Sequence, residues 1–264
     1  MRVSILALSS ALLSPASAHY FFGRLILDGK WTETWEYIRE ISPVNNTDEI
    51  ALQYPNTNPD SLDLRCGRNA SNAWSKPKTA TIQAGAKVGF AIGKHPNGGG
   101  GLEPTMYHPG FGSAWLSKSP TEDLNAYAGD GDWAKILQIV ERTEQSVDWT
   151  KEENKKKYDA TKAWWGTWHA DSWNFTIPVT TPPGKYLLRF EHIFPNKWDA
   201  QYYVNCAHIE VVNPSATVGT PSPTVKIPGV YTRGQPDVYF SSYDYYFTPS
   251  LMPFIPPKPE VWKG

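Results

Sequence analysis

The sequence predicts an all-β domain of the β-sandwich class with long connections and short helices. Short runs rich in β-branched and aromatic residues alternate apolar and polar positions, and clusters of proline, glycine and asparagine separate them. No internal repeat is visible along the 264 residues. Without residues 1–18, the remaining length suits one large domain, residues 19–264, better than two small ones.

The expected strands are short and follow one another along the chain. The Pro-Pro-Gly sequence at 182–184 predicts a tight turn that leads directly into one of them. A single charged stretch, 152–161, is the best helix candidate and is expected on the surface. The clearest strand candidates are 79–82, 87–92, 114–117, 172–177, 186–191 and 208–212.

Two further segments are expected to be irregular. The glycine run at 98–101 lacks the Lys-Ser/Thr that follows a phosphate-binding loop, so we interpret it as a flexible loop. From Pro214 the chain becomes rich in proline, serine and threonine, and it contains no further cysteine. We expect this tail to wrap the same domain. It has no hydrophobic end, so no lipid anchor is expected.

The first eighteen residues have the pattern of a secretory signal peptide. Arg2 gives a positive start, 3–13 is apolar but too short to span a bilayer, and 16–18 is a small-x-small cleavage site. The alternative is an uncleaved anchor. Cleavage leaves His19 as the mature N-terminus of a secreted, extracellular protein.

Composition narrows the class of partner. The formal net charge of −1 offers no basic excess to attract nucleic acid or an anionic membrane. Twelve tryptophans and fourteen tyrosines exceed what a core needs, so some are available to pack on sugar rings. Cys66 and Cys206 are expected to form a disulfide after export, with two buried thiols as the alternative. Glycosylation sequons begin at Asn45, Asn69 and Asn174.

His19 is the strongest chemical signal. An N-terminal histidine offers two nitrogens, its amine and its imidazole, and a second histidine would supply a third. Nitrogen donors in a tetragonal arrangement favour copper. His108, before a Pro-Gly turn, is the candidate for that third nitrogen, with an ordinary surface histidine as the alternative. Chance placement is the alternative for His19.

Gln201 and Tyr203 are two residues apart, so in a strand they share a face. A tyrosine oxygen can lie near an axial position of the metal, and a glutamine amide can hydrogen-bond to a metal-bound oxygen species. Tyr203 favours copper over zinc, whereas a core tyrosine is the alternative. No carboxylate pair of a glycosidase and no G-x-S-x-G motif of a serine hydrolase stands out.

Together these features resemble the fungal lytic polysaccharide monooxygenases of auxiliary activity family nine. The resemblance covers nearly the whole mature chain. It is carried by His19 and by the motifs at 107–110 (Tyr-His-Pro-Gly), 132–136, 177–178, 184–191, 200–203, 206–207, 227–231 and 261–262.

The resemblance implies an immunoglobulin-like or fibronectin-like β-sandwich and a site. His19 and His108 would hold one copper ion, Tyr203 would be axial, Gln201 would assist beside it, and Cys66 and Cys206 would match the family disulfide. The activity implied is oxidative cleavage of β-1,4-glucan, cellulose or a relative, at C1 and/or C4. It needs dioxygen or hydrogen peroxide and an external reductant or electron-donating oxidoreductase. A monomer is expected.

One position departs from the family pattern, which has a further histidine between the 184–191 motif and Gln201. Counting forward from Glu191 places Asn196 there, whereas counting back from Gln201 points to His192. We favour Asn196, because His192 directly follows Glu191 inside the strand. Asparagine cannot exchange a proton near neutral pH. Restoring histidine at 196 is then expected to raise turnover, and a non-catalytic copper-binding or glucan-binding wall protein is the alternative function.

Substrate contacts are expected from aromatic residues, with core packing as the alternative for each. An early segment supplies one group and the late tail supplies the other. They are Trp31, Trp35 and Tyr37, and Tyr243, Tyr245 and Tyr246.

Overall fold

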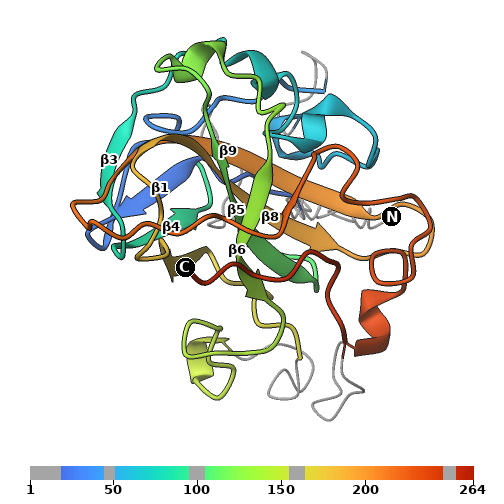
Figure 1. Cartoon of the computed structure of the whole chain (residues 1–264). Helices are drawn as coiled ribbons and strands as arrows, with labels where there is room; N and C mark the ends of the chain where they lie inside the picture. Colours follow the sequence, from blue (N-terminus) through green and yellow to red (C-terminus); the bar gives the residue numbers. More distant parts are fainter. Residues whose placement is uncertain (1–18, 45–50, 95–104, 155–163, 246–253) are drawn as a thin grey trace, which may run out of the picture.

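The computed structural model describes residues 19–44, 51–94, 105–154, 164–245 and 254–264 (Figure 1). Within these ranges two sheets face each other, with four strands in the order β2-β1-β4-β7 and six in the order β10-β6-β5-β8-β9-β3. The strands are β1 (Arg24–Leu27), β2 (Lys30–Trp31), β3 (Ala80–Gln83), β4 (Lys87–Ala91), β5 (Phe111–Lys118), β6 (Trp133–Ile139), β7 (Ser172–Thr176), β8 (Gly184–Phe194), β9 (Gln201–Val212) and β10 (Thr224–Val225).

Short 3-10 turns supply the rest of the regular structure in the described part of the chain. They are η1 (Ala51–Gln53), η2 (Leu62–Leu64), η3 (Ala70–Asn72), η4 (Leu124–Ala126), η5 (Glu152–Asn154) and η7 (Ser242–Tyr245). The predicted helix at 152–161 is therefore wrong in its first turn, which is η5, and its remaining residues lie outside the described ranges. The predictions at 1–18 and 98–101 also lie outside them.

The core between the sheets confirms the β-sandwich. In β7 the side chains of Trp173 and Phe175 point inward and alternate with more exposed neighbours, as a half-buried strand requires. Phe90 of β4 and Phe190 of β8 stack across the two layers, with ring centroids 5.3 Å apart. Apolar side chains from both sheets thus close one continuous core.

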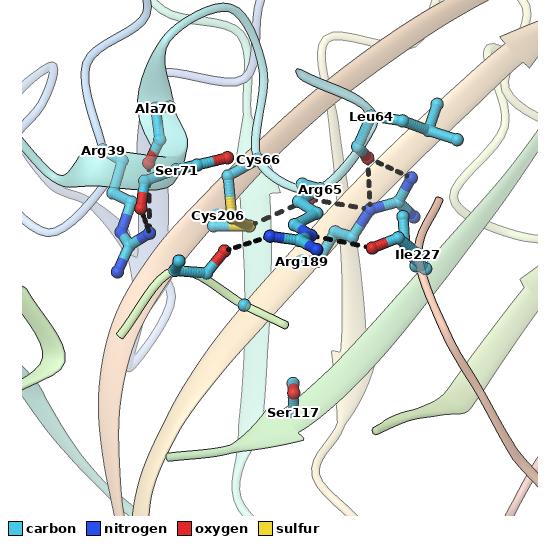
Figure 2. Close-up of a disulfide and its surroundings, with 12 residues drawn as sticks. Arg39, Leu64, Arg65, Cys66, Ala70, Ser71, Ser117, Arg189, Cys206 and Ile227 are labelled. Carbon is cyan, nitrogen blue, oxygen red and sulfur yellow. Dashed lines mark hydrogen bonds between the residues drawn. A yellow bond between two sulfur atoms is a disulfide. The ribbon is translucent and has the colours of Figure 1, made fainter. Parts of the chain in front are cut away.

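The larger sheet is also covered on its outer side. Trp115 and Leu187 belong to a second buried cluster, built from loops and from the late part of the chain. The disulfide between Cys66 and Cys206 lies there and confirms the predicted pairing (Figure 2). Beside it the Arg189 guanidinium donates to the main-chain oxygen of Leu64 (Figure 2). This side of the sheet is therefore a built interior, not a solvent face.

The tail after Pro214 runs back over the same body. Its strand β10 pairs with β6, and the main-chain N–H of Trp262 donates to the oxygen of Lys135 in β6. The Trp262 side chain is part of the core between the sheets. In the described ranges, no helix has the length and apolar character of a membrane span.

Candidate metal centre

Three rings that are distant in sequence meet at one end of the sandwich. His19 begins the extended segment that leads into β1, His108 lies just before β5, and Tyr203 is the third residue of β9. Ring centroids are 5.8 Å apart for His19 and His108, 6.5 Å for His19 and Tyr203, and 6.1 Å for His108 and Tyr203. The fold therefore brings together the residues that the sequence singled out.

His108 is held in an unusual environment. Its ring stacks on Phe194, with centroids 4.4 Å apart and planes 15° apart, and only 9 % of the residue is exposed. Burial, reinforced by His19 and His169, lowers its pKa to about 4. Neither ring nitrogen has a hydrogen-bond partner among the described residues, although both are buried. Buried polar atoms are normally paired. The two ring nitrogens of this neutral imidazole are therefore available to bind a metal ion.

The other two members of this group of rings, His19 and Tyr203, are also in their uncharged forms. Burial lowers the pKa of His19, whose ring lies 5.0 Å from that of Tyr54. Burial, and then the nearby Tyr243, raises the pKa of Tyr203 well above its usual value. The Tyr203 hydroxyl is a neutral phenol that donates to Oε1 of Gln201 at 2.6 Å. The two imidazoles and the phenol are thus uncharged near neutral pH.

A third imidazole, that of His192, lies behind this cluster. His192 pairs with Tyr203 across the β8–β9 ladder, and their ring centroids are 6.3 Å apart. Burial, and then His108, lowers its pKa to about 3. Thr167 donates its hydroxyl proton to Gly110, so its oxygen is left to accept from Nε2 of His192 at 3.0 Å. Nδ1 therefore accepts from the Tyr20 hydroxyl, which fixes one neutral tautomer.

Comparison with known proteins by sequence gives matches to one family. The sequence profile of Auxiliary Activity family 9 (formerly GH61) matches residues 19–250. AA9 family lytic polysaccharide monooxygenase U from Thermothielavioides terrestris is 34% identical over the full length of both chains. Lytic polysaccharide monooxygenase A of the same family, from Aspergillus fumigatus, is 36% identical over all of this chain and 83% of its own. The chain belongs to Auxiliary Activity family 9.

Solved structures agree at the level of the fold. The crystal structure of HiLPMO9B aligns with a TM-score of 0.66 over 93% of this chain and 100% of that one, at 22% identity. Family membership makes the chain a copper-dependent enzyme that cleaves polysaccharides oxidatively.

The residues present fit a copper ion. Copper favours nitrogen donors, and His108 offers two buried nitrogens without another partner. In the described part of the chain no three His, Cys, Asp or Glu side chains form a cluster.

Asn196 lies in a turn, outside the strands. It belongs to the connection between β8 and β9, and its Oδ1 accepts from the main-chain N–H of Trp198 at 3.1 Å. His192 lies in β8, with its ring centroid 6.3 Å from that of Tyr203. The strand continues to Phe194, so a histidine directly after Glu191 can still face the cluster. The two counts from the sequence therefore end in different places, with His192 in the strand beside Tyr203 and Asn196 in the turn.

The aromatic residues expected to contact substrate differ in exposure and in their position relative to His108. Tyr243 is 54% exposed, and its ring lies 5.8 Å from that of Phe194, which stacks on His108. Tyr245 packs in the second core cluster. Trp31 is 40% exposed but sits in β2 next to Ile26, at the far end of β1 from His19.

The remaining early candidates are mostly packing residues. Trp35 stacks on Phe21 with centroids 4.7 Å apart, and Tyr37 packs against the main core. Tyr246 lies outside the described residues.

Sequence reasoning missed two aromatic residues near the cluster and one on the hairpin tip. Tyr54 contacts His19, and Tyr107 is 43% exposed with its ring 5.5 Å from His108. Its place next to His108 in the Tyr-His-Pro-Gly motif was the available signal. Trp198, in the β8–β9 connection, is the most exposed large apolar side chain among the described residues, at 85%.

The sequons lie in different settings. Asn69 is exposed, and its Nδ2 donates to the hydroxyl of Ser42. Asn174 is half-buried in β7, where Gln145 binds both its main-chain N–H and its oxygen. Asn45 lies outside the described residues.

Proposed function

We propose that the exported chain, after loss of residues 1–18, holds one copper ion with the amine and imidazole of His19 and the imidazole of His108. The phenol of Tyr203 would lie beside the ion, because its ring is 6.5 Å from that of His19 and 6.1 Å from that of His108. The unpaired nitrogens of buried His108 are the observation that carries this assignment. The family match, which begins at His19, supports the processed N-terminus.

Bound copper supplies one-electron chemistry that activates dioxygen or hydrogen peroxide once a reductant or partner oxidoreductase has reduced it. The side chains set its surroundings. Gln201 accepts from the Tyr203 hydroxyl through Oε1, which leaves its amide N–H groups available to donate to other acceptors. Tyr203 stacks on Tyr20, with centroids 4.0 Å apart, so the phenol cannot swing away.

His192 acts in this proposal as a positioning residue. Its Nε2 donates to the hydroxyl oxygen of Thr167, and its Nδ1 accepts from the hydroxyl of Tyr20. The Tyr20 ring in turn stacks on Tyr203. With its pKa held at about 3, it stays neutral over the working range of most enzymes. Asn196, which caps a turn, takes no part in proton exchange.

The substrate we propose is a β-1,4-linked glucan, cellulose or a related polymer, oxidised at C1 and/or C4 by a monomeric enzyme. Two exposed rings lie near His108: Tyr107, 5.5 Å from it, and Tyr243, 5.8 Å from the Phe194 ring on which His108 stacks. The alternative is a non-catalytic copper- or glucan-binding wall protein in which Asn196 replaces a proton-exchanging histidine; the buried His192 beside Tyr203 supports the enzyme.

The experiment uses copper-loaded protein beginning at His19, incubated with amorphous cellulose, xyloglucan and other β-glucans, plus ascorbate and a peroxide feed. Mass spectrometry should find oxidised oligosaccharides, and a His19→Ala variant should form none. Absence of oxidised products on every glucan, with stoichiometric copper bound, would refute the proposed activity.

A further inference from the structure

The connection between β8 and β9, residues 195–200, is braced from two directions. On the inside, Oδ1 of Asn196 accepts from the main-chain N–H of Trp198, a local turn that fixes the backbone. The closing pair of the hairpin is Phe194 with Gln201, so this turn stands directly above the last rung of the ladder.

From the outside, Arg233 joins the hairpin tip to the rest of the protein. Its guanidinium donates to the main-chain oxygens of Trp198, at 3.4 Å, and Thr57, at 2.9 Å. It also lies 3.7 Å from the carboxylate of Asp199 and 5.9 Å from the centre of the Tyr239 ring. The ion pair is exposed and contributes little by itself. The bonds to two carbonyl groups are what hold the loop in one geometry.

The side chain presented by this brace has almost no protein contact. Trp198 is 85% exposed, whereas Trp115, Trp133 and Trp165 are fully buried. Single exposed apolar residues are common, but a tryptophan held on an ordered tip leaves a broad aromatic face in water. Such a face is available to a ligand, because neither the core nor the loop uses its area.

The hairpin tip lies at the same end of the molecule as the rings of His19, His108 and Tyr203. Trp198 is five residues from Tyr203, so their Cα atoms are at most about 18 Å apart. A second connection runs through the segment 54–57. Its Tyr54 packs on His19 and its Thr57 is bound by Arg233.

We propose that Trp198 is a stacking platform for a sugar ring of a β-linked glucan, at a distance from the bond that is oxidised. Asn196 and Arg233 are the positioning residues that aim it. This inference rests on the substrate class proposed above. The C–H face of a glucose ring packs on the flat indole, so the platform adds affinity for an extended chain without entering the chemistry.

Binding is measured with copper-loaded protein in the absence of reductant, so that no turnover occurs. The probes are hydroxyethyl cellulose in affinity electrophoresis and amorphous cellulose in a depletion assay. Trp198→Ala is expected to weaken binding about tenfold, and Trp198→Phe to retain most of it. Trp31→Ala is the matched control, because Trp31 is also exposed but lies at the far end of β1. It should bind like the wild type.

Two results would overturn the platform: equal binding by Trp198→Ala and the wild type, or equal losses in the Trp198 and Trp31 variants. Failure of the wild type to bind either glucan would overturn it as well. Oxidised products measured separately with reductant report on the proposed function. An enzyme that oxidises glucan but ignores Trp198 refutes only this inference, and one that binds through Trp198 without oxidation refutes only the proposed function.

The role of Asn196 has its own test. Asn196→Asp keeps an oxygen acceptor for the N–H of Trp198 and should bind glucan like the wild type. Asn196→Ala removes the acceptor and should bind about threefold more weakly. Asn196→His should resemble the alanine variant and should not raise turnover. Equal weakening by Asp and Ala, or a gain in turnover with His, would contradict the assignment of Asn196 to the brace.

Discussion

Replacing His208 by glutamine should make the folded chain less sensitive to acid. His208 is fully buried in β9, where its Nε2 accepts from Nε of Arg39 at 2.8 Å. Burial, and then the positive charge of Arg39, lowers the pKa of this imidazole from 6.5 to about 3, against a smaller opposing effect of Asp123. A glutamine oxygen can accept the same bond, but it does not titrate.

The sign of the effect follows from proton uptake. The unfolded chain binds a proton at His208 near pH 6.5, whereas the folded chain resists it until about pH 3. The contribution of His208 to stability is therefore fully present above pH 6.5 and is lost as the pH falls toward 3. Each pH unit in this window removes about 1.4 kcal/mol for one proton. Between pH 6.5 and 4.5 the loss is about 3 kcal/mol, or roughly 6–12 °C in Tm at this chain length.

The assay is denaturant unfolding of the wild type and His208→Gln at pH 7.5 and pH 4.5. The wild type should lose about 3 kcal/mol more than the variant over this range, whatever their difference at pH 7.5. A difference in unfolding free energy that stays constant across the two pH values would show that His208 is not excluded from protonation in the fold.

Three further changes test other parts of the structure. His108→Ala should abolish stoichiometric copper binding in calorimetric titration, and wild-type affinity in this variant would remove His108 from the metal site. Tyr231→Phe takes a hydroxyl donor from the buried carboxylate of Glu191, so the urea midpoint should report a loss of about 1.5–3 kcal/mol. Replacing Cys66 and Cys206 together by alanine opens a loop with a sequence separation of 140 and should lower unfolding free energy by up to about 5 kcal/mol; an unchanged Tm would contradict this.

The strands of the sandwich could be predicted where one face of the strand is buried and the other is exposed. The strand β7 is the clearest case, since Trp173 and Phe175 alternate with polar neighbours and face the core. The disulfide was also predictable, because a pair of cysteines in an exported chain leaves a single connectivity.

The full length of β8 and β9 was not predictable from the same pattern. Both faces of the larger sheet are covered, so β8 is buried continuously from Tyr186 to Phe194 and has no alternation to mark its ends. The layer that covers it comes from distant loops and from the tail, which no local pattern shows. The chemistry of His19 was visible in the sequence, whereas the stacking of His108 on Phe194 depends on how the strand ends meet.

The position of the third imidazole shows why counting along one strand is not enough. From Glu191 the count to the family histidine ends in the turn, at Asn196, whereas the count back from Gln201 ends in the strand, at His192. The ladder instead runs to Phe194 and pairs it with Gln201, so the register couples His192 to Tyr203. A cross-strand pair is set by both strands together. The hairpin thereby performs two tasks at once. Its last rungs place Tyr203 beside His19 and His108, and its turn, capped by Asn196, carries the exposed side chain of Trp198.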